Sequence, residues 1–274
     1  MQNSEYLEKK AISINNYLYS NINLDIFVGN TIGNRCHMQD FYYIDEYKEL
    51  IIISLADGHG GSDISNNLSK NLNILYDIVL LFDDKLVSKK IFEKKINKFF
   101  LYLDNKFKKF KNQGSTLSIV ILSTKYIYHI NLGDSNMVYV KNNSIIHNSI
   151  IHRPNNKSES LRIKKSYDIT NNRIDSSLSF SRSIGDYKYK IYNDKYDGIL
   201  SAISVIPSIN YFNRLSDSYI IFSTDGFHDF IDINNVINIL NKHTIDNQII
   251  NKLINYTIQK GSNDNITLII IKIK

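Results

Sequence analysis

Residues 50–61 read LIIISLADGHGG, an apolar run that ends in an acid, a histidine and three glycines. A run of this length, rich in Ile, is typical of a buried strand, and the glycines indicate a turn at its end. Three other apolar runs also carry an acid at one end: Tyr126–Leu132 before Gly133-Asp134, Tyr219–Thr224 before Asp225-Gly226, and Ile266–Ile271 after Asp264-Asn265. The sequence therefore predicts four strands that each place an aspartate at one end.

Segments with helical spacing lie between these runs, at Ile64–Phe82, Leu86–Phe110 and Asn234–Ile258. In the first segment apolar residues recur every three or four positions, which predicts one apolar stripe packed on a sheet. Helices that come in pairs after runs of strands favour an antiparallel α+β fold over a doubly wound parallel sheet. The polar, interrupted stretch Asn155–Ser177 is predicted to be a surface excursion.

The composition is that of an ordinary globular protein. A chain of 274 residues suits a single domain, and its 43% hydrophobic and 22% charged residues exclude intrinsic disorder. Cys36 is the only cysteine, so an intrachain disulfide is excluded and a reducing compartment is indicated. The first twenty residues, which predict either a leading strand or a mobile tail, lack a signal peptide's apolar core, and no run could span a bilayer. We expect a soluble, intracellular protein, cytoplasmic or nuclear, monomeric and without a membrane partner.

A net charge of +6 raises the question of a nucleic-acid partner. The dense basic stretch is Lys106–Lys111, where lysines alternate with Phe107 and Phe110. Such alternation could give nucleic acid a stacking and phosphate-binding platform. It also suits the end of an amphipathic helix with Phe inward and Lys outward, and we favour that interpretation. A specific nucleic-acid partner is therefore not expected.

The recurrence of aspartates at strand ends points to a metal site. One Asp-Gly pair is ordinary turn chemistry. Several converging carboxylates, however, would repel one another unless divalent cations lay among them, and Mg²⁺ and Mn²⁺ prefer oxygen ligands and retain water. Two such ions can activate a water and clamp a phosphoryl group for in-line attack. The pattern predicts hydrolysis of a phosphomonoester, with an arginine as the best holder of its oxygens.

Seven short motifs occur in an order that resembles the metal-dependent protein phosphatases, the type 2C serine/threonine phosphatases. They are GNRCHMQD at 33–40, DGHGG at 57–61, GST at 114–116, GDS at 133–135, SRSIGD at 181–186, DGFHD at 225–229 and SNDNIT at 262–267. The resemblance covers nearly the whole chain. It implies an antiparallel β-sandwich flanked by pairs of antiparallel helices, in four α-β-β-α layers. It also implies one catalytic domain over residues 1–274, with a variable flap around 155–175.

The activity implied by this resemblance is hydrolysis of phosphoserine and phosphothreonine in phosphoprotein substrates, with two or three Mg²⁺ or Mn²⁺ ions as cofactors. The implied metal-binding residues are Asp57, which would bridge two ions, the carbonyl of Gly58, Gln39, Asp225 and Asp264, and for a third ion Asp134 and Asp229. Arg35 matches the arginine that holds phosphate, and His59 matches the histidine proposed as general acid. Asp40 would orient waters or ligands from behind.

The clearest departure from the family pattern is Gln39, which stands where the family usually has Glu. An amide oxygen can bind a divalent cation but brings no charge, so the metal requirement should rise. This motivates a second hypothesis, a pseudophosphatase that acts as a binding or scaffolding module. Retention of Asp57, Asp225 and Asp264 favours an active enzyme. Substrate preference stays open because the recognition region also departs, at Ile151-His152-Arg153-Pro154 and at Ser176.

Overall fold

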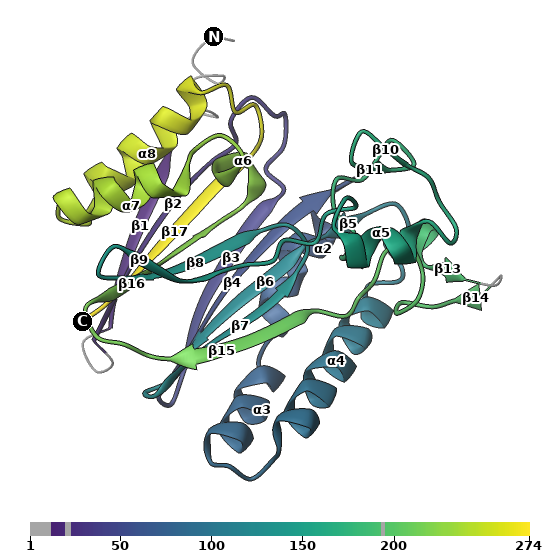
Figure 1. Cartoon of the computed structure of the whole chain (residues 1–274), viewed down its shortest axis with the longest axis horizontal. Helices are drawn as coiled ribbons and strands as arrows, with labels where there is room; N and C mark the ends of the chain where they lie inside the picture. The colour runs from purple at the N-terminus through teal and green to yellow at the C-terminus, as the bar shows by residue number, and fades with distance from the viewer. Residues whose placement is uncertain (1–11, 20–22, 193–194) are drawn as a thin grey trace. The chain divides into compact units, whose positions relative to one another are not determined.

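The structure, a computed structural model, describes residues 12–19, 23–192 and 195–274 and divides into two compact units. Unit 1 consists of the described residues of Met1–Asp40, Ser135–Ser149 and Asn213–Lys274. Unit 2 consists of those of Phe41–Asp134 and Ile150–Phe212. Each unit is built on one large antiparallel sheet with helices packed on it (Figure 1). The predicted α+β class with antiparallel sheets is confirmed, whereas the single domain over 1–274 stays a prediction.

Unit 1 contains a six-stranded sheet in the order β1-β2-β17-β16-β8-β9. Its strands are β1 (Ser13–Tyr19), β2 (Leu24–Thr31), β8 (Asn136–Lys141), β9 (Ser144–Asn148), β16 (Ser218–Ser223) and β17 (Ile266–Ile273). The central strand β17 reads ITLIIIKI and is buried along nearly its whole length, as expected of a strand covered on both faces. Part of the N-terminal segment is thus a leading strand, while residues 1–11 lie outside the described part.

Two helices, α7 (Ile233–Lys242) and α8 (Asn247–Gln259), pack on one face of the unit 1 sheet (Figure 1). The sequence indicates one helical segment over Asn234–Ile258, but the structure breaks it at His243. The reason is local, because the Asp246 side chain accepts a hydrogen bond from the N–H of Ile249 and so caps a new helix. A short helix α6 (Asp225–His228) follows β16 directly.

Unit 2 contains a seven-stranded sheet in the order β12-β5-β4-β6-β7-β15, with β3 also paired to β4. Its strands are β3 (Asp40–Tyr47), β4 (Leu50–His59), β5 (Gly114–Ser115), β6 (Leu117–Leu122), β7 (Tyr126–Leu132), β12 (Ile184–Gly185) and β15 (Ser208–Asn213). The short strand β5 lies between the end of β4 and β12. The end of β4 is therefore held next to the SRSIGD motif.

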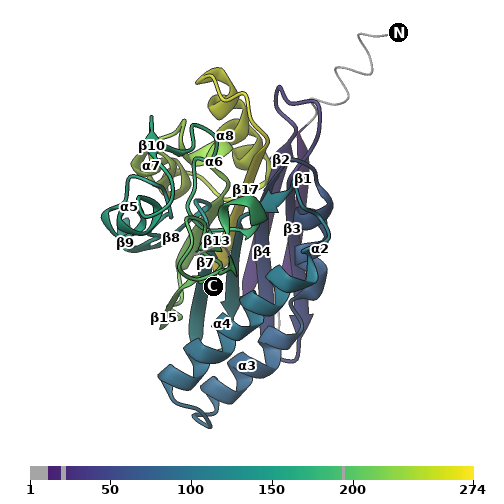
Figure 2. The same cartoon turned by 90° about the vertical axis from the view of Figure 1, so that its right-hand side faces the viewer.

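Helices α3 (Ile74–Asp83) and α4 (Lys89–Lys106) lie side by side against the unit 2 sheet (Figure 2). The predicted helix over Ile64–Phe82 is broken into α2 (Asp63–Leu68), the 3₁₀ turn η2 (Ser69–Asn71) and α3. In this region the side-chain amides of Asn67 and Asn71 donate to backbone carbonyls four residues earlier, so they compete with the backbone N–H groups of a continuous helix.

The predicted surface excursion, Asn155–Ser177, has a small core of its own. It contains α5 (Lys157–Ile163) and the hairpin of β10 (Ile169–Thr170) and β11 (Arg173–Ile174). Ile163 and Ile174 are fully buried in a cluster with Phe180, Tyr189 and Ile203. The 3₁₀ turn η3 (Tyr187–Tyr189) and the hairpin of β13 (Ile191–Tyr192) and β14 (Lys195–Tyr196) follow. Within the described ranges, no helix is long and apolar enough to cross a bilayer.

Candidate functional site

The end of β4 carries the first group of predicted site residues, Asp57, Gly58 and His59. The backbone of Asp57 is fixed on both sides by the GST motif. Its N–H donates to the Thr116 hydroxyl at 3.1 Å, and its carbonyl accepts from the N–H of Thr116 at 2.9 Å and from the hydroxyl of Ser115 at 3.1 Å. Three hydrogen bonds to the backbone of this residue restrict its conformation, so the position of the Asp57 side chain is fixed at its Cα.

His59 is bound to Asp186 of the SRSIGD motif. Its Nε2 lies 2.6 Å from Asp186 Oδ1, and the Ser183 hydroxyl donates to Asp186 Oδ2 at 2.6 Å. The aspartate is 9% exposed and its N–H donates to the carbonyl of Gln113 at 3.0 Å. The imidazole of His59 also packs on the ring of Phe180, with centroids 5.1 Å apart. Its orientation is therefore set by a carboxylate on one side and an aromatic ring on another.

The charge of this pair favours a protonated histidine. Burial lowers the pKa of His59. The charge of the Asp186 carboxylate, its hydrogen bond and the more distant Asp134 raise the pKa by more than burial lowers it, so the pKa of His59 is above its usual value. Gly114 makes the contact possible, because a Cβ at this position would collide with His59 and Asp186. A histidine whose pKa is raised by a carboxylate is suited to donate a proton.

Asp134 follows strand β7 and is buried, with 1% of its surface exposed. Its Oδ2 lies 3.5 Å from Nε of Arg153. The segment that supplies this arginine is fixed by His152, whose N–H donates to the carbonyl of Gly133 at 2.9 Å while its Nδ1 accepts from the N–H of Gly133 at 3.1 Å. The predicted ligand of a third metal ion is thus already matched by one positive charge, which an incoming ion would have to displace.

In unit 1, Arg35 and Asp264 form an ion pair. The guanidinium Nη2 lies 2.7 Å from Asp264 Oδ2, while Oδ1 accepts the N–H of Asn265 at 2.8 Å. Both side chains are partly exposed, at 55% for Arg35 and 37% for Asp264. Because an ion pair in water is worth only ~0–1 kcal/mol, either partner can exchange for a more strongly charged ligand.

Two further predicted ligands of unit 1 lie close to Asp264. Asp225 begins α6 directly after β16, and a Cβ added to the next residue, Gly226, would lie 3.2 Å from Cβ of Asp264. The N–H of Gln39 donates to the Asn265 side chain at 2.7 Å. Asp229 is different, because it ends α6 on the exposed surface, 3.7 Å from Nε2 of His228.

Asp40 lies behind this loop cluster and is buried, with 3% exposed. Its Oδ2 accepts hydrogen bonds from the hydroxyls of Thr224 at 2.9 Å and Thr267 at 2.8 Å. Burial raises its pKa to about 7, although the two threonine hydrogen bonds act in the opposite direction. Because Thr224 precedes Asp225 and Thr267 follows Asp264, Asp40 ties together the strand ends that carry them.

The chemistry of these donors fits a divalent cation. Asp57, Asp225 and Asp264 offer carboxylate oxygens, and Gly58 and Gln39 offer neutral oxygens, which is the mixture that Mg²⁺ and Mn²⁺ accept. Within the part of the chain that the structure describes, no three His, Cys, Asp or Glu side chains form a metal-binding group. Asp57 belongs to unit 2 while Asp225 and Asp264 belong to unit 1. The binuclear centre therefore stays a prediction.

Comparison with known families shows which family the chain belongs to. Residues 30–266 match the family model described as "Protein phosphatase 2C". The chain belongs to the protein phosphatase 2C family. Among curated relatives it is 26% identical over 252 residues to "Probable protein phosphatase 2C 52" of Oryza sativa subsp. japonica, covering 88% of this chain and 48% of the relative. It is 27% identical over 241 residues to "Protein phosphatase 1B" of Rattus norvegicus, covering 80% and 61%. The chain thus spans about half to two-thirds of the length of these relatives.

Solved structures of phosphatases share the fold. A phosphatase from a pathogenic strain of Toxoplasma gondii matches with a TM-score of 0.78 and 18% identity, over 97% of this chain and 96% of that one. Serine-threonine phosphatase 2C from Toxoplasma gondii gives a TM-score of 0.72 and 17% identity, over 97% and 100%. At this identity the likeness shows the fold alone, and it confirms the predicted fold class.

Several residues that contact the predicted site residues were missed by sequence reasoning. Asp186, Thr224 and Asn265 stand inside or beside quoted motifs but received no role. Their contacts join segments separated by more than one hundred residues, and no short-range pattern signals such pairs. A usable hint was the presence of polar residues within the motifs that no predicted role explained. Arg153 was noted only as a departure, although it is the partner of Asp134.

Proposed function

We propose that this chain is a Mg²⁺ or Mn²⁺ dependent protein phosphatase that hydrolyses phosphoserine and phosphothreonine in phosphoprotein substrates. The observation that carries the proposal is the bonded pair of His59 and Asp186 directly after Asp57 and Gly58. In this proposal the proton donor His59 follows two residues after Asp57, the predicted metal-binding carboxylate. Membership of the protein phosphatase 2C family supports the reaction class.

Asp57, the carbonyl of Gly58, Asp225, Asp264 and Gln39 would hold two cations. Bound Mg²⁺ or Mn²⁺ would supply an activated water and neutralise phosphate charge. Arg35 would hold phosphate oxygens, since its planar guanidinium donates two parallel hydrogen bonds. Its ion pair with Asp264 is partly exposed, so a dianionic phosphate can replace the carboxylate.

His59 would protonate the leaving alkoxide of serine or threonine. Asp186 binds Nε2, which leaves Nδ1 as the nitrogen that would donate to the leaving oxygen, and the carboxylate favours the charged form of the ring. General acid catalysis of this kind contributes roughly 10²–10⁴-fold. The contribution should be large for an alkoxide, which leaves poorly, and small for a nitrophenolate, which leaves well without a proton.

The test is hydrolysis of p-nitrophenyl phosphate and of a phosphothreonine peptide in millimolar Mn²⁺. We expect turnover of both, loss of both in EDTA, and loss of both in Asp57→Ala and Asp225→Ala. Asp77→Asn on the exposed side of α3 is the matched control, because it also removes one carboxylate. His59→Gln should slow the peptide much more than the nitrophenyl ester.

The alternative is a pseudophosphatase that binds partners without turnover, and its motivation is Gln39. Absence of turnover at any Mn²⁺ concentration, in protein that is folded by circular dichroism, would support the scaffold and contradict the enzyme. If Gln39 is a ligand, Gln39→Glu should lower the metal concentration needed for half-maximal rate, because a carboxylate adds charge to the shell. An unchanged metal requirement would show that this side chain does not bind the ion.

A further inference from the structure

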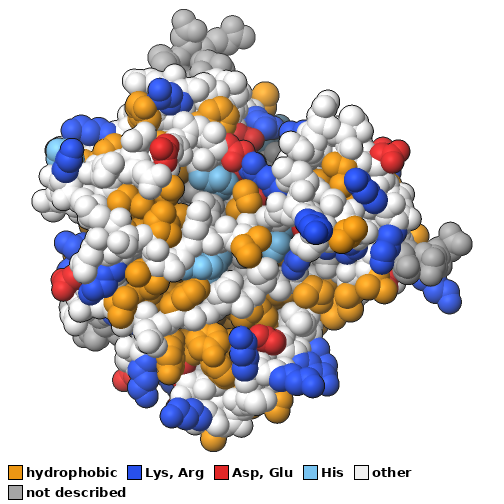
Figure 3. Space-filling view, viewed as in Figure 1, with side chains coloured by type: hydrophobic (Ala, Val, Ile, Leu, Met, Phe, Trp, Pro, Cys, Tyr) orange, Lys and Arg blue, Asp and Glu red, His pale blue; other side chains and the backbone are white. Residues whose placement is uncertain are grey.

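Residues 85–111 concentrate positive charge. This stretch contains ten lysines and two acids, Glu93 and Asp104, a net charge of +8 that exceeds the +6 of the whole chain. All ten lysines are exposed. Asp104 does not offset them at the surface, because it is fully buried with Lys190 at 2.7 Å. In the space-filling view, basic side chains lie over the lower part of the molecule, where Figure 1 places α3 and α4 (Figure 3).

The carboxyl end of this stretch is a rigid element that we call the basic turn, residues 106–111. Phe107 is buried and Phe110 packs on the same core, while Lys106, Lys108, Lys109 and Lys111 are exposed. Backbone bonds from Lys108 to Asn105 at 3.3 Å and from Phe110 to Phe107 at 2.9 Å hold the turn. Among the described residues, none of its four lysines forms an ion pair. The turn therefore presents four unneutralised ammonium groups from a fixed backbone.

The chain runs from the basic turn directly to the candidate catalytic histidine. The carbonyl of Gln113 accepts the N–H of Asp186, and Gly114 touches both His59 and Asp186. Lys111 is three residues before Gly114, so their Cα atoms are at most ~11 Å apart. A second acid, Asp63, also contacts this segment, because its carboxylate accepts from the Gln113 amide at 2.7 Å.

We propose that the basic turn binds acidic side chains of the phosphoprotein substrate, about three to five residues from the phosphorylated residue. This rests on the proposed function. An extended peptide rises ~3.3 Å per residue, so three to five residues cover roughly 10–17 Å, which is enough to span the ~11 Å limit between Lys111 and Gly114, the residue that touches His59. Complementary charge of this kind speeds encounter and tightens substrate binding rather than changing the chemical step.

The structure favours an acidic peptide over other polyanions. Single-stranded nucleic acid needs exposed aromatic rings for base stacking, but Phe107 is 4% exposed and Phe110 packs on the core. An anionic membrane surface would be reinforced by apolar side chains that insert, but the exposed Leu86 and Ile91 lie at the opposite end of α4. The rings nearest the basic turn, Tyr102 and Tyr196, lie 6.0 and 4.7 Å from the ammonium groups of Lys106 and Lys108. A flexible acidic peptide needs only the charge of these lysines.

The experiment compares two phosphothreonine peptides that differ only in Glu or Gln at the third, fourth and fifth positions from the phosphorylated residue, on both sides. The wild-type protein should prefer the Glu peptides in kcat/KM by roughly tenfold at low salt, through KM, because several exposed ion pairs act together. Lys108→Gln, Lys109→Gln and Lys111→Gln combined should remove the preference and leave p-nitrophenyl phosphate turnover unchanged. The control combines Lys90→Gln, Lys94→Gln and Lys98→Gln at other positions on α4, removes the same charge, and should keep the preference.

If both triple variants lost the preference for the Glu peptide equally, the inference would be overturned, because net charge alone would then explain the preference. A preference that survives in the basic-turn variant would also overturn it. Tighter binding of a DNA oligonucleotide than of the Glu peptide at physiological salt would do the same. Failure of the proposed function would look different, because p-nitrophenyl phosphate would then not be hydrolysed. In that case fluorescence anisotropy of the labelled peptides, with the same two triple variants, decides the inference on the basic turn.

Discussion

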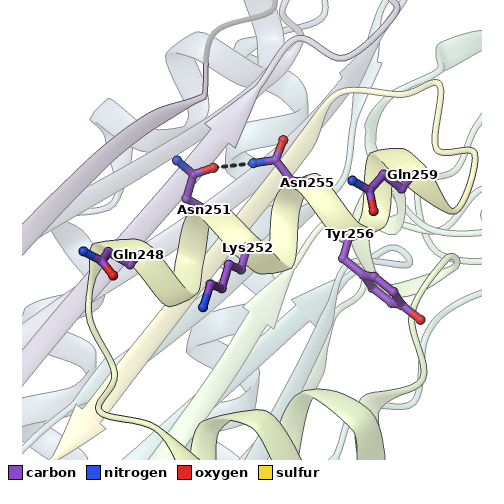
Figure 4. Close-up of a pocket in the computed structure, with 6 residues that line it drawn as sticks. All are labelled: Gln248, Asn251, Lys252, Asn255, Tyr256 and Gln259. Carbon is purple, nitrogen blue, oxygen red and sulfur yellow. Dashed lines mark hydrogen bonds between the residues drawn. The ribbon is translucent and has the colours of Figure 1, made fainter.

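Helix α4 of unit 2 and helix α8 of unit 1 each cover one face of an antiparallel sheet, but they do so with different chemistry. The buried face of α4 is largely aromatic, with Phe92, Phe99 and Phe100, and α4 also buries a carboxylate, Asp104. The buried face of α8 is aliphatic and lies over Gly29 of β2. The outer face of α8 carries Gln248, Asn251, Lys252, Asn255, Tyr256 and Gln259, with a hydrogen bond between the two asparagines (Figure 4).

This comparison separates what the fold needs from what it does not. Both helices need an apolar face, and both have one. The fold does not need a row of lysines outside, because α8 packs on its sheet with mostly uncharged side chains on its outer face. The positive charge at the end of α4 is therefore available to a partner at the basic turn, and the buried charge of α4 is a separate feature that positions the SRSIGD segment.

The largest expected effect comes from breaking the buried anchor of α4. Asp104 binds Lys190, the N–H of Gly185 and the hydroxyl of Tyr196. Asp104→Ala leaves the fully buried Lys190 unpaired, and this should lower the free energy of unfolding by about 3–5 kcal/mol in urea titrations. Asp104→Leu combined with Lys190→Met should recover most of the loss. A loss below about 1 kcal/mol in Asp104→Ala would show that water reaches Lys190 and that the anchor is not buried.

The next effect is a dependence on pH that differs between the units. Burial, with a smaller contribution from Arg182, lowers the pKa of His152 to about 3, well under its usual 6.5. Between pH 6.5 and 3 the unfolded chain binds the proton that the folded chain does not, so stability falls as pH is lowered, by up to ~1.4 kcal/mol per unit. Asp40 in unit 1 acts with the opposite sign, because its pKa is raised to about 7.

The prediction is therefore a difference between variants of the metal-free protein. His152→Gln should remove a loss of about 2 kcal/mol between pH 6.5 and 5, measured as free energy of unfolding relative to the wild type. The exposed His243→Gln is the matched control and should follow the wild-type curve. Parallel curves for His152→Gln and the wild type would mean that His152 also becomes protonated in the folded chain.

Sequence reasoning predicted the elements of both units better than their pairings. Strand β4 and the other strands that carry an aspartate at one end were predicted correctly, because a contiguous apolar run is a local signal in the sequence. Asp104, in a lysine-rich helix, and Lys190 are charged residues that the sequence alone would place on the surface. They nevertheless form a buried ion pair, although 86 positions separate them in the sequence. The pair of His59 and Asp186 spans 127 positions. A family motif marks such residues as present, but only the β5 register explains why they touch.

A smaller effect is expected where α8 meets its sheet. A Cβ at Gly29 would lie 2.6 Å from Cδ1 of Ile254 and still closer to Ile250. Gly29→Ala should therefore destabilise the protein by about 1 kcal/mol, at the low end for overpacking, because isoleucine side-chain ends can move. Combining it with Ile254→Val, which removes the Cδ1 methyl group that the new Cβ would meet, should reduce the loss in thermal unfolding. A combined variant that is less stable than the sum of both changes would contradict this account of the contact.

The smallest effect tests whether the lysines of α4 cost stability. Lys94 lies four residues from both Lys90 and Lys98, and like charges at this spacing destabilise a helix by roughly 0.2–0.5 kcal/mol per pair. Lys94→Gln should thus stabilise the protein by about 0.4–1 kcal/mol at low salt, and added salt should shrink the gain. On α8, Asn251→Gln changes no charge and should show neither the gain nor the salt dependence. A gain that persists at high salt would instead assign the effect to helix propensity and leave the surface lysines without an energetic cost.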